Sequence, residues 1–356
     1  MMKRFFTNWF GDKKEVEADT TVRVLCLDGG GIRGLIPAVA LDQLEKRVGK
    51  SCGEIFHLIA GTSTGGLIAL GLTKPNPFSA ADMADFYRSH GPDIFKRSMV
   101  HAARSLGGYL DDLYQTDSFE ALLRDKLGNN WLSGNLPETL VTAYDIERRQ
   151  PRYFSSWKAR GDKMDFGTEE DACDFLLPDL ARAITAAPSY FRPALIQDRC
   201  GATHPLIDGG VFANNPSIAA LMEARILFPK AENILLVSLG TGTLERPIEY
   251  KTTLKYGKLD WVEPVMSIMA SALDQAIDRQ LSLDLGEEDY FRFQTHLLSF
   301  DNDTPGPSDD FDNVTPENID RLERRAYEML DWESDRMEAL VERLKSNPRC
   351  DKDILI

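Results

Sequence analysis

The sequence predicts an α/β fold with a mostly parallel central sheet. Short apolar segments typical of buried strands alternate along the chain with segments whose apolar residues recur at helical spacing. Several of these strands run directly into glycine-rich turns that precede a helix. The 356 residues, 43% of them hydrophobic, are enough for one large α/β domain or two modest ones. Ligands of such sheets bind beyond the carboxyl ends of the strands, so site residues are expected directly after them.

The first strand is predicted at 22–27, which is almost entirely apolar and therefore typical of an interior parallel strand. A loop with the sequence DGGGIRG follows at 28–34, and a helix is predicted over 36–48. A strand, a glycine loop and a helix in this order leave free N–H groups facing the loop, and such an arrangement receives anions.

Two chemistries compete for this loop. Gly29, Gly31 and Gly34 satisfy the G-x-G-x-x-G fingerprint of dinucleotide-binding proteins, which also requires an acidic residue at the end of a second strand. The chain instead reaches an apolar segment at 55–60 and then a serine turn. The acidic partner is therefore missing where a ribose would need it, although an oxidoreductase remains the alternative hypothesis.

The other chemistry is an oxyanion hole. In that case the backbone N–H groups of Gly29, Gly30 and Gly31 point at the negative charge that forms on an ester carbonyl oxygen. Each such donor lowers the barrier by roughly 3 kcal/mol. Arg33 would add a positive charge nearby. This interpretation is favoured because a candidate nucleophile lies on the next strand-to-helix turn.

That nucleophile is Ser63, within the sequence GTSTG at 61–65, which fits the pattern G-x-S-x-G. The preceding segment 58–60 is predicted to be a short buried strand, and 66–72 begins an apolar helix. The glycines allow strained backbone dihedrals and leave the serine hydroxyl uncrowded. Because so short a pattern often arises by chance, its interpretation depends on the other motifs.

The rest of the chain continues the alternation. Strands are predicted at 140–145, 152–156, 205–207 and 234–239, the last being the final clear core strand, and helices at 80–90, 109–113, 117–127, 179–187, 216–228, 253–285 and 317–344. The irregular helical region 74–135 has two open interpretations, a lid over the site and a packing layer without a moving part. Segment 294–298 also has the look of a strand, and the acidic segment 301–313 is expected to be a solvated loop rather than a calcium site.

A serine hydroxyl needs a base within hydrogen-bond reach. The sequence has five histidines, His57, His90, His101, His204 and His296. A triad in the order Ser…Asp…His would require His296, which shows no loop-tip glycine, and each histidine is more typical of a surface or structural role. The alternative base is Asp208, which follows a strand and stands on a glycine turn whose N–H groups can hold a carboxylate.

Composition excludes several other classes of function. The formal net charge of −15 argues against a nucleic-acid ligand. The five cysteines show no paired spacing, which indicates reduced thiols in a cytoplasmic protein rather than a disulfide framework or a zinc site. No segment is as long and apolar as a membrane span.

The expected organisation is an N-terminal arm at 1–20, a catalytic core at 21–245 and a mainly helical C-terminal region at 246–356 that packs on the core.

Together these motifs resemble the patatin-like phospholipases. The match comprises DGGGIRG at 28–34, GTSTG at 61–65 and DGG at 208–210, with RAITAAP at 182–188 and NNP at 214–216 around the last of them. It covers roughly residues 20 to 245, and three motifs in the family's order make it specific. The resemblance implies a three-layer α/β/α fold with helical insertions.

The same resemblance implies the chemistry. Ser63 would be the nucleophile and Asp208 the base of a Ser–Asp dyad, with Gly29, Gly30, Gly31 and Arg33 at the oxyanion site. The reaction implied is hydrolysis of fatty-acyl esters of membrane glycerophospholipids through an acyl-serine intermediate, without a metal or a cofactor. A non-catalytic lipid-binding module, in which the serine turn is only structural, is the third hypothesis.

Bacterial patatin-like effectors of antiphage defence, which cyclic dinucleotides activate, are similar in their short single-domain layout. By this analogy a cyclic dinucleotide is the candidate activator. A homo-oligomer is a further hypothesis, and the expected location is the cytoplasm, with action at the membrane surface. The sequence itself shows no nucleotide site.

Overall fold

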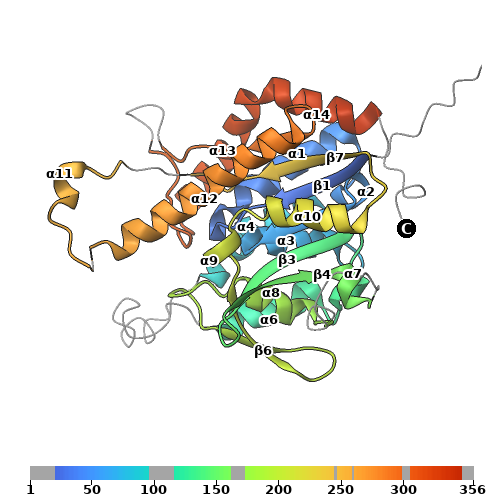
Figure 1. Ribbon diagram of the computed structural model, residues 1–356, viewed down its shortest axis with the longest axis horizontal. Coiled ribbons are helices and arrows are strands. Elements are labelled where there is room, and N and C mark those ends of the chain that lie inside the picture. The colour runs from blue at the N-terminus through green and yellow to red at the C-terminus, as the bar shows by residue number, and fades with distance from the viewer. Residues whose placement is uncertain are drawn as a thin grey trace, which may run out of the picture.

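The computed structural model describes residues 21–95, 116–161, 173–243, 247–258, 260–298 and 305–346 (Figure 1). The strands are β1 (Thr21–Leu27), β2 (Leu58–Thr62), β3 (Glu138–Asp145), β4 (Gln150–Ser155), β5 (Ala194–Gln197), β6 (Thr203–Asp208), β7 (Asn233–Leu239) and β8 (Tyr290–Phe293). The longer helices are α1 (Leu35–Val48), α3 (Thr64–Thr73), α4 (Ala80–Ile94), α6 (Thr116–Leu127), α8 (Leu177–Ile184), α10 (Ser217–Leu227), α12 (Val262–Leu285), α13 (Pro316–Trp332) and α14 (Ser334–Ser346). Short helices are η1 (Gly31–Gly34), α2 (Cys52–Ile55), η2 (Leu132–Gly134), α7 (Ser156–Ala159), α9 (Gly210–Ala213) and α11 (Tyr250–Thr253). The arm at 1–20 and the helix predicted at 109–113 lie outside the described residues.

Eight strands of the described chain form one sheet in the order β5-β6-β3-β2-β1-β7-β8, with β4 pairing with β3 off this path. The neighbours from β3 through β2, β1 and β7 to β8 pair in parallel. Strands β4, β5 and β6 join by antiparallel pairing. The mostly parallel α/β sheet that the sequence predicts is therefore confirmed.

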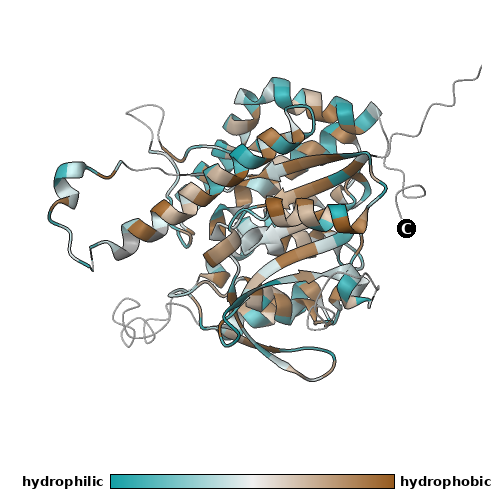
Figure 2. Cartoon of the chain, viewed as in Figure 1, coloured by the Kyte–Doolittle hydropathy of each residue, from teal (hydrophilic) through white to brown (hydrophobic). Residues whose placement is uncertain are grey.

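Helices cover both faces of the sheet, which gives three layers (Figure 1). Strand β1 shows why, because its side chains alternate between two apolar clusters. Val24 and Cys26 pack with α10 and with Leu281 of α12 on one face. Leu25 and Leu27 pack on the other face, where α1, α3, α4, α8 and α13 lie. Both faces of the central strands are thus buried, in keeping with their hydrophobic colouring in Figure 2.

The C-terminal region contributes a strand to the sheet as well as helices. Strand β8 pairs with β7 from Leu236 opposite Tyr290 to Leu239 opposite Phe293, so the prediction that 234–239 is the last core strand is wrong. The strand suspected at 294–298 forms only an isolated bridge, between Thr243 and His296. Sequence pattern missed β8 because it is four residues long and contains a charged residue. The sheet therefore continues beyond residue 245.

The described part of the region 74–135 packs into the core. Helix α4 buries Met83, Ala84 and Tyr87 in the main apolar cluster, and α6 buries Phe119 and Leu123 there. These helices form a packing layer, which was one of the two interpretations of this region. Residues 96–115, which separate them, are not described.

Candidate active site

Ser63 occupies the tight turn between β2 and α3. Its backbone has φ 53° and ψ −122°, a conformation that a residue with a side chain rarely adopts. Strain of this kind is what places the serine of a G-x-S-x-G turn at the edge of a sheet with its hydroxyl exposed to the site. The structural context that the sequence predicted for this motif, a buried strand before it and an apolar helix after it, is present.

The glycines on either side of Ser63 are required by close backbone contacts. A Cβ atom on Gly61 would stand 2.2 Å from the carbonyl oxygen of Gly65. A Cβ atom on Gly65 would stand 2.3 Å from the carbonyl oxygen of Leu27, at the end of β1. Helix α3 therefore begins in direct contact with β1, and this contact places the serine beside the glycine loop that follows β1.

Asp208 reaches Ser63 because two strands end facing each other along one edge of β3. Strand β2 pairs with β3 up to Thr62 opposite Thr142, and β6 runs the other way and ends with Asp208 opposite Ala143. Strand β4 occupies the opposite edge of β3 throughout these positions. The last residue of β6 therefore meets the residue that follows β2.

The Ser63 hydroxyl donates a hydrogen bond of 2.6 Å to Oδ2 of Asp208. Oδ1 of the same carboxylate accepts a hydrogen bond of 2.7 Å from the N–H of Gly210. Burial raises the pKa of Asp208 to about 6, while these two hydrogen bonds act in the opposite direction. A base whose pKa lies close to neutrality is well matched to accepting and returning a proton.

The glycine loop offers two backbone donors. The N–H of Gly29 is occupied, since it donates to the carbonyl oxygen of Asn214 at 3.0 Å. The N–H groups of Gly30 and Gly31 donate to no acceptor within the described part of the chain. The loop nevertheless lies against the serine, because a Cβ atom on Gly29 would stand 3.3 Å from Cβ of Ser63. Of the three predicted donors, Gly30 and Gly31 are available in this conformation and Gly29 is not.

Arg33 contacts the glycine loop and two segments beside it through its guanidinium group. Its Nε donates to the carbonyl oxygen of Gly30 at 3.3 Å, and its Nη1 donates to that of Gly242 at 3.4 Å. The guanidinium lies 4.5 Å from the centre of the Phe311 ring. Burial lowers its pKa to about 10, so it remains charged at neutral pH. These contacts indicate that Arg33 shapes the loop, whereas the sequence suggested a charge beside the oxyanion.

Phe311 also bears on the dinucleotide hypothesis. A pyrophosphate would need the N–H groups at the start of the helix that follows the glycine loop. The N–H of Ile32 already donates to the carbonyl oxygen of Phe311 at 2.9 Å. A Cβ atom on Gly31, whose φ is +59°, would stand 2.3 Å from that same oxygen. The segment around Phe311 therefore occupies one of the N–H groups that a pyrophosphate would need and packs against Gly31.

None of the four histidines in the described residues hydrogen-bonds to Ser63. His57 accepts a hydrogen bond of 2.9 Å from the N–H of Arg23, at the start of the strands. Nε2 of His204 lies 2.9 Å from Oδ2 of Asp198. Both residues belong to the β5–β6 hairpin, at the opposite end of β6 from Asp208. Nδ1 of His296 lies 3.4 Å from the hydroxyl oxygen of Thr243, and Nδ1 of His90 lies 3.9 Å from Oδ2 of Asp93. His101 is outside the described residues.

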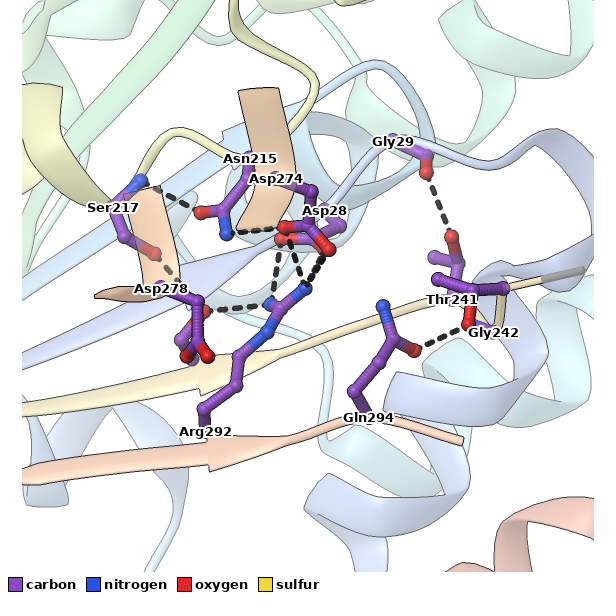
Figure 3. Close-up of polar contacts among 12 residues, drawn as sticks. Asp28, Gly29, Asn215, Ser217, Thr241, Gly242, Asp274, Asp278, Arg292 and Gln294 are labelled. Atoms are coloured by element: carbon purple, nitrogen blue, oxygen red, sulfur yellow. Dashed lines mark hydrogen bonds and ion pairs between the residues drawn. The ribbon is translucent and has the colours of Figure 1, made fainter. Parts of the chain in front are cut away.

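The structure adds a buried polar cluster behind the glycine loop that sequence reasoning missed (Figure 3). Arg292 of β8 donates two hydrogen bonds to Asp28, of 3.0 and 2.6 Å, and others to Asp274 of α12 and to Ser238. Asn215 donates to the same Asp274. Burial alone would lower the pKa of Arg292, but the Asp28 carboxylate beside it raises that pKa above its usual value. The one signal in the sequence is a lone charge within a short apolar segment.

A parallel α/β sheet with a strained serine, a buried carboxylate and free loop amides at its carboxyl edge has the architecture of a serine acyl hydrolase. Comparison with known proteins specifies the class further. The sequence model of the family described as patatin-like phospholipase matches residues 25–221. Patatin-like protein 2 of Arabidopsis thaliana is 34% identical over 351 residues, covering 87% of this chain and 83% of its own. Patatin-2-Kuras 4 of Solanum tuberosum is 29% identical, covering 85% and 84% respectively.

The chain therefore belongs to the patatin-like phospholipase family, and it is a hydrolase with lipid acyl hydrolase activity. Among solved structures, VipD from Legionella pneumophila covers 88% of this chain and 67% of its own at 12% identity, with a TM-score of 0.41. No helix in the described residues is both long enough and apolar enough to cross a membrane.

Proposed function

We propose that this hydrolase cleaves fatty-acyl esters of membrane glycerophospholipids with Ser63 as nucleophile and Asp208 as its base. The observation that carries the proposal is the 2.6 Å hydrogen bond from the Ser63 hydroxyl to the buried carboxylate of Asp208. No histidine in the described residues stands in the position of a base, so the carboxylate takes the proton directly. The free N–H groups of Gly30 and Gly31 are the proposed donors to the oxyanion.

The reaction proceeds in two halves. Oγ of Ser63 attacks the ester carbonyl carbon as its proton passes to Asp208, and the tetrahedral intermediate carries its negative charge beside the loop amides. Collapse of the intermediate breaks the ester bond, and the departing lysophospholipid alkoxide takes the proton from Asp208. Water then attacks the acyl-serine, again giving its proton to Asp208. That proton returns to Ser63 as the fatty acid leaves.

The pKa of Asp208 predicts the pH dependence. The base must be ionised to accept the serine proton, and burial raises its pKa to about 6. We therefore expect kcat/KM for a soluble ester to be level above that pH and to fall about tenfold for each pH unit below it. A stopped assay from pH 4 to 9 measures this. An acid limb near pH 4, where an ordinary aspartate titrates, would contradict a buried base.

The substrate surface is proposed from exposed apolar side chains at one side of the molecule. Helix α12 extends away from the body of the protein (Figure 1), and hydrophobic residues lie along it (Figure 2). Val265, Ile268, Met269 and Leu273 on this helix are 40–54% exposed. The preceding stretch 250–258 carries three exposed lysines and no acidic residue, in a chain of net charge −15. Apolar and basic side chains together suit an anionic lipid surface.

We expect the double variant Ile268→Asp/Met269→Asp to bind anionic vesicles at least tenfold more weakly than the wild type, because it places charge in the apolar contact. Hydrolysis of a soluble short-chain ester should be unchanged. Co-sedimentation with vesicles of phosphatidylglycerol and phosphatidylcholine measures binding. Leu195→Asp is the matched control. Leu195 is 70% exposed on β5, the strand at the opposite end of the sheet from β8. Equal binding by both variants and the wild type would remove α12 from the lipid contact.

The proposed location is the cytoplasm, and the proposed activator is a cyclic dinucleotide, as in the antiphage effectors of similar layout. The experiment that tests the function is lipid mass spectrometry after incubating purified protein with phospholipid vesicles, with and without cyclic dinucleotides. Lysolipid and free fatty acid in equal amounts support the phospholipase.

Products that appear only with the nucleotide support the proposed activator. Light scattering on the same samples tests the homo-oligomer. Vesicles left intact under both conditions, by protein that a fluorophosphonate probe does not label, would favour the non-catalytic module.

A further inference from the structure

The tip of β7 touches the glycine loop on the side away from the serine. Thr241, which follows β7, is 3% exposed, and its hydroxyl donates a hydrogen bond of 2.7 Å to the carbonyl oxygen of Gly29 (Figure 3). A Cβ atom on Gly30 would stand 2.3 Å from that hydroxyl oxygen, so the contact also requires glycine at position 30. Thr241 lies outside residues 25–221, the part of the chain that matches the family.

This hydrogen bond fixes the direction of one peptide group. In a trans peptide the C=O and the N–H point in opposite directions, so a Gly29 carbonyl held towards Thr241 turns the Gly30 N–H away from it. Strand β1 lies between β7 on one side and β2 on the other. Away from β7 is therefore towards β2, whose end carries Ser63. The Gly30 N–H has no acceptor in the described residues and is presented on the nucleophile's side.

Residues in β8 and directly after it hold both Asp28 and the segment that carries Thr241. Oε1 of Gln294, directly after β8, accepts a hydrogen bond of 2.9 Å from the N–H of Gly242, which holds the loop that carries Thr241. Arg292 holds Asp28, the residue before Gly29, through its two hydrogen bonds. Both contacts are drawn in Figure 3. The glycine loop is thus fixed at its start by Arg292 and at its first carbonyl by Thr241.

We propose that Thr241 is a positioning residue for acyl transfer, whose hydroxyl orients the Gly29–Gly30 peptide so that the Gly30 N–H faces the developing oxyanion. The proposal rests on the function proposed for Ser63. Thr241 does not contact the substrate and acts through the backbone of the loop. Its effect therefore belongs to the transition state, where the carbonyl oxygen carries negative charge, more than to substrate binding.

The test compares Thr241→Val, which keeps the shape of the side chain and removes the hydroxyl, with Thr241→Ser, which keeps the hydroxyl. With a soluble ester we expect Thr241→Val to lower kcat by roughly 10- to 100-fold with KM within about twofold of the wild type, since loss of a whole oxyanion donor lowers it about 10²- to 10³-fold. Labelling of Ser63 by a fluorophosphonate should slow in parallel, because its phosphoryl oxygen meets the same donor. Thr241→Ser should restore both rates to within about threefold.

Both variants are assayed at a temperature where circular dichroism shows them folded. If Thr241→Val keeps wild-type kcat, or if the serine and valine variants lose activity equally, the proposal is overturned, because the hydroxyl is then not what matters. A rise in KM with unchanged kcat would also overturn it. Absence of turnover and labelling in the wild type would overturn the proposed function itself, and this proposal with it.

Discussion

Ser63→Ala is expected to lower kcat for a soluble ester by about 10⁴-fold or more, and Asp208→Asn to come within about tenfold of the same loss. Each removes one member of a pair that transfers a single proton, so the effects should not add in the double variant. Initial rates with purified protein measure all three. Full activity in Asp208→Asn would eliminate the proposed dyad, whereas activity in Ser63→Ala would eliminate the nucleophile.

The matched control is Asp198→Asn, which alters a second buried aspartate at the other end of β6. Asp198 holds its hairpin by hydrogen bonds from the N–H groups of Cys200 and Ala202 and by its contact with His204. We expect this variant to lose stability while keeping its turnover at temperatures where it is folded. Asp208→Asn should do the opposite, because it removes a charge whose burial is unfavourable. Denaturant midpoints, measured beside the rates, separate the two roles.

Arg292→Leu is expected to lower the free energy of unfolding by about 3–5 kcal/mol, since it leaves the buried carboxylate of Asp28 and the half-buried one of Asp274 without their cation. Urea denaturation followed by circular dichroism measures the change. Arg225→Leu is the control, because the Arg225–Asp284 ion pair is 47% exposed on both side chains. Loss of that pair should change stability by about 0–1 kcal/mol. A loss of unfolding free energy in Arg292→Leu as small as that in Arg225→Leu would contradict a stabilising role for the Arg292 cluster.

Local sequence was enough to predict the parts of the site whose shape depends on adjacent residues. The turn around Ser63 follows from its glycines and from the apolar segments beside it, and those contacts lie within a few residues or on the next strand. The loop after β1 was predicted for the same reason. The pairing of Ser63 with Asp208 was different. The glycine turn made Asp208 one candidate base, but the assignment of a Ser–Asp dyad came from resemblance to a family. Nothing in the local pattern indicates that β6 runs antiparallel and ends facing β2.

What the sequence did not reveal depends on contacts between distant segments. The engagement of the Gly29 N–H by Asn214 joins residues 185 positions apart, and Arg292 meets Asp28 across 264 positions. Strand β8 was missed because four residues do not establish a period, and its charged residue interrupts the apolar run. Phe311 lies in a segment that sequence analysis described as a solvated loop, yet it packs on Arg33. Charge and spacing alone do not predict such contacts.

The position of β7 and β8 has a practical consequence for anyone who shortens the gene. A fragment that stops where the family match ends, at residue 221, omits β7, one of the two neighbours of β1. That apolar central strand then becomes an exposed edge of the sheet, which is prone to aggregation. A fragment that stops at 245 keeps β7 but lacks Arg292, so the acid in front of the glycine loop has no counter-ion. The smallest piece worth expressing therefore extends past residue 298 and includes the segment around Phe311.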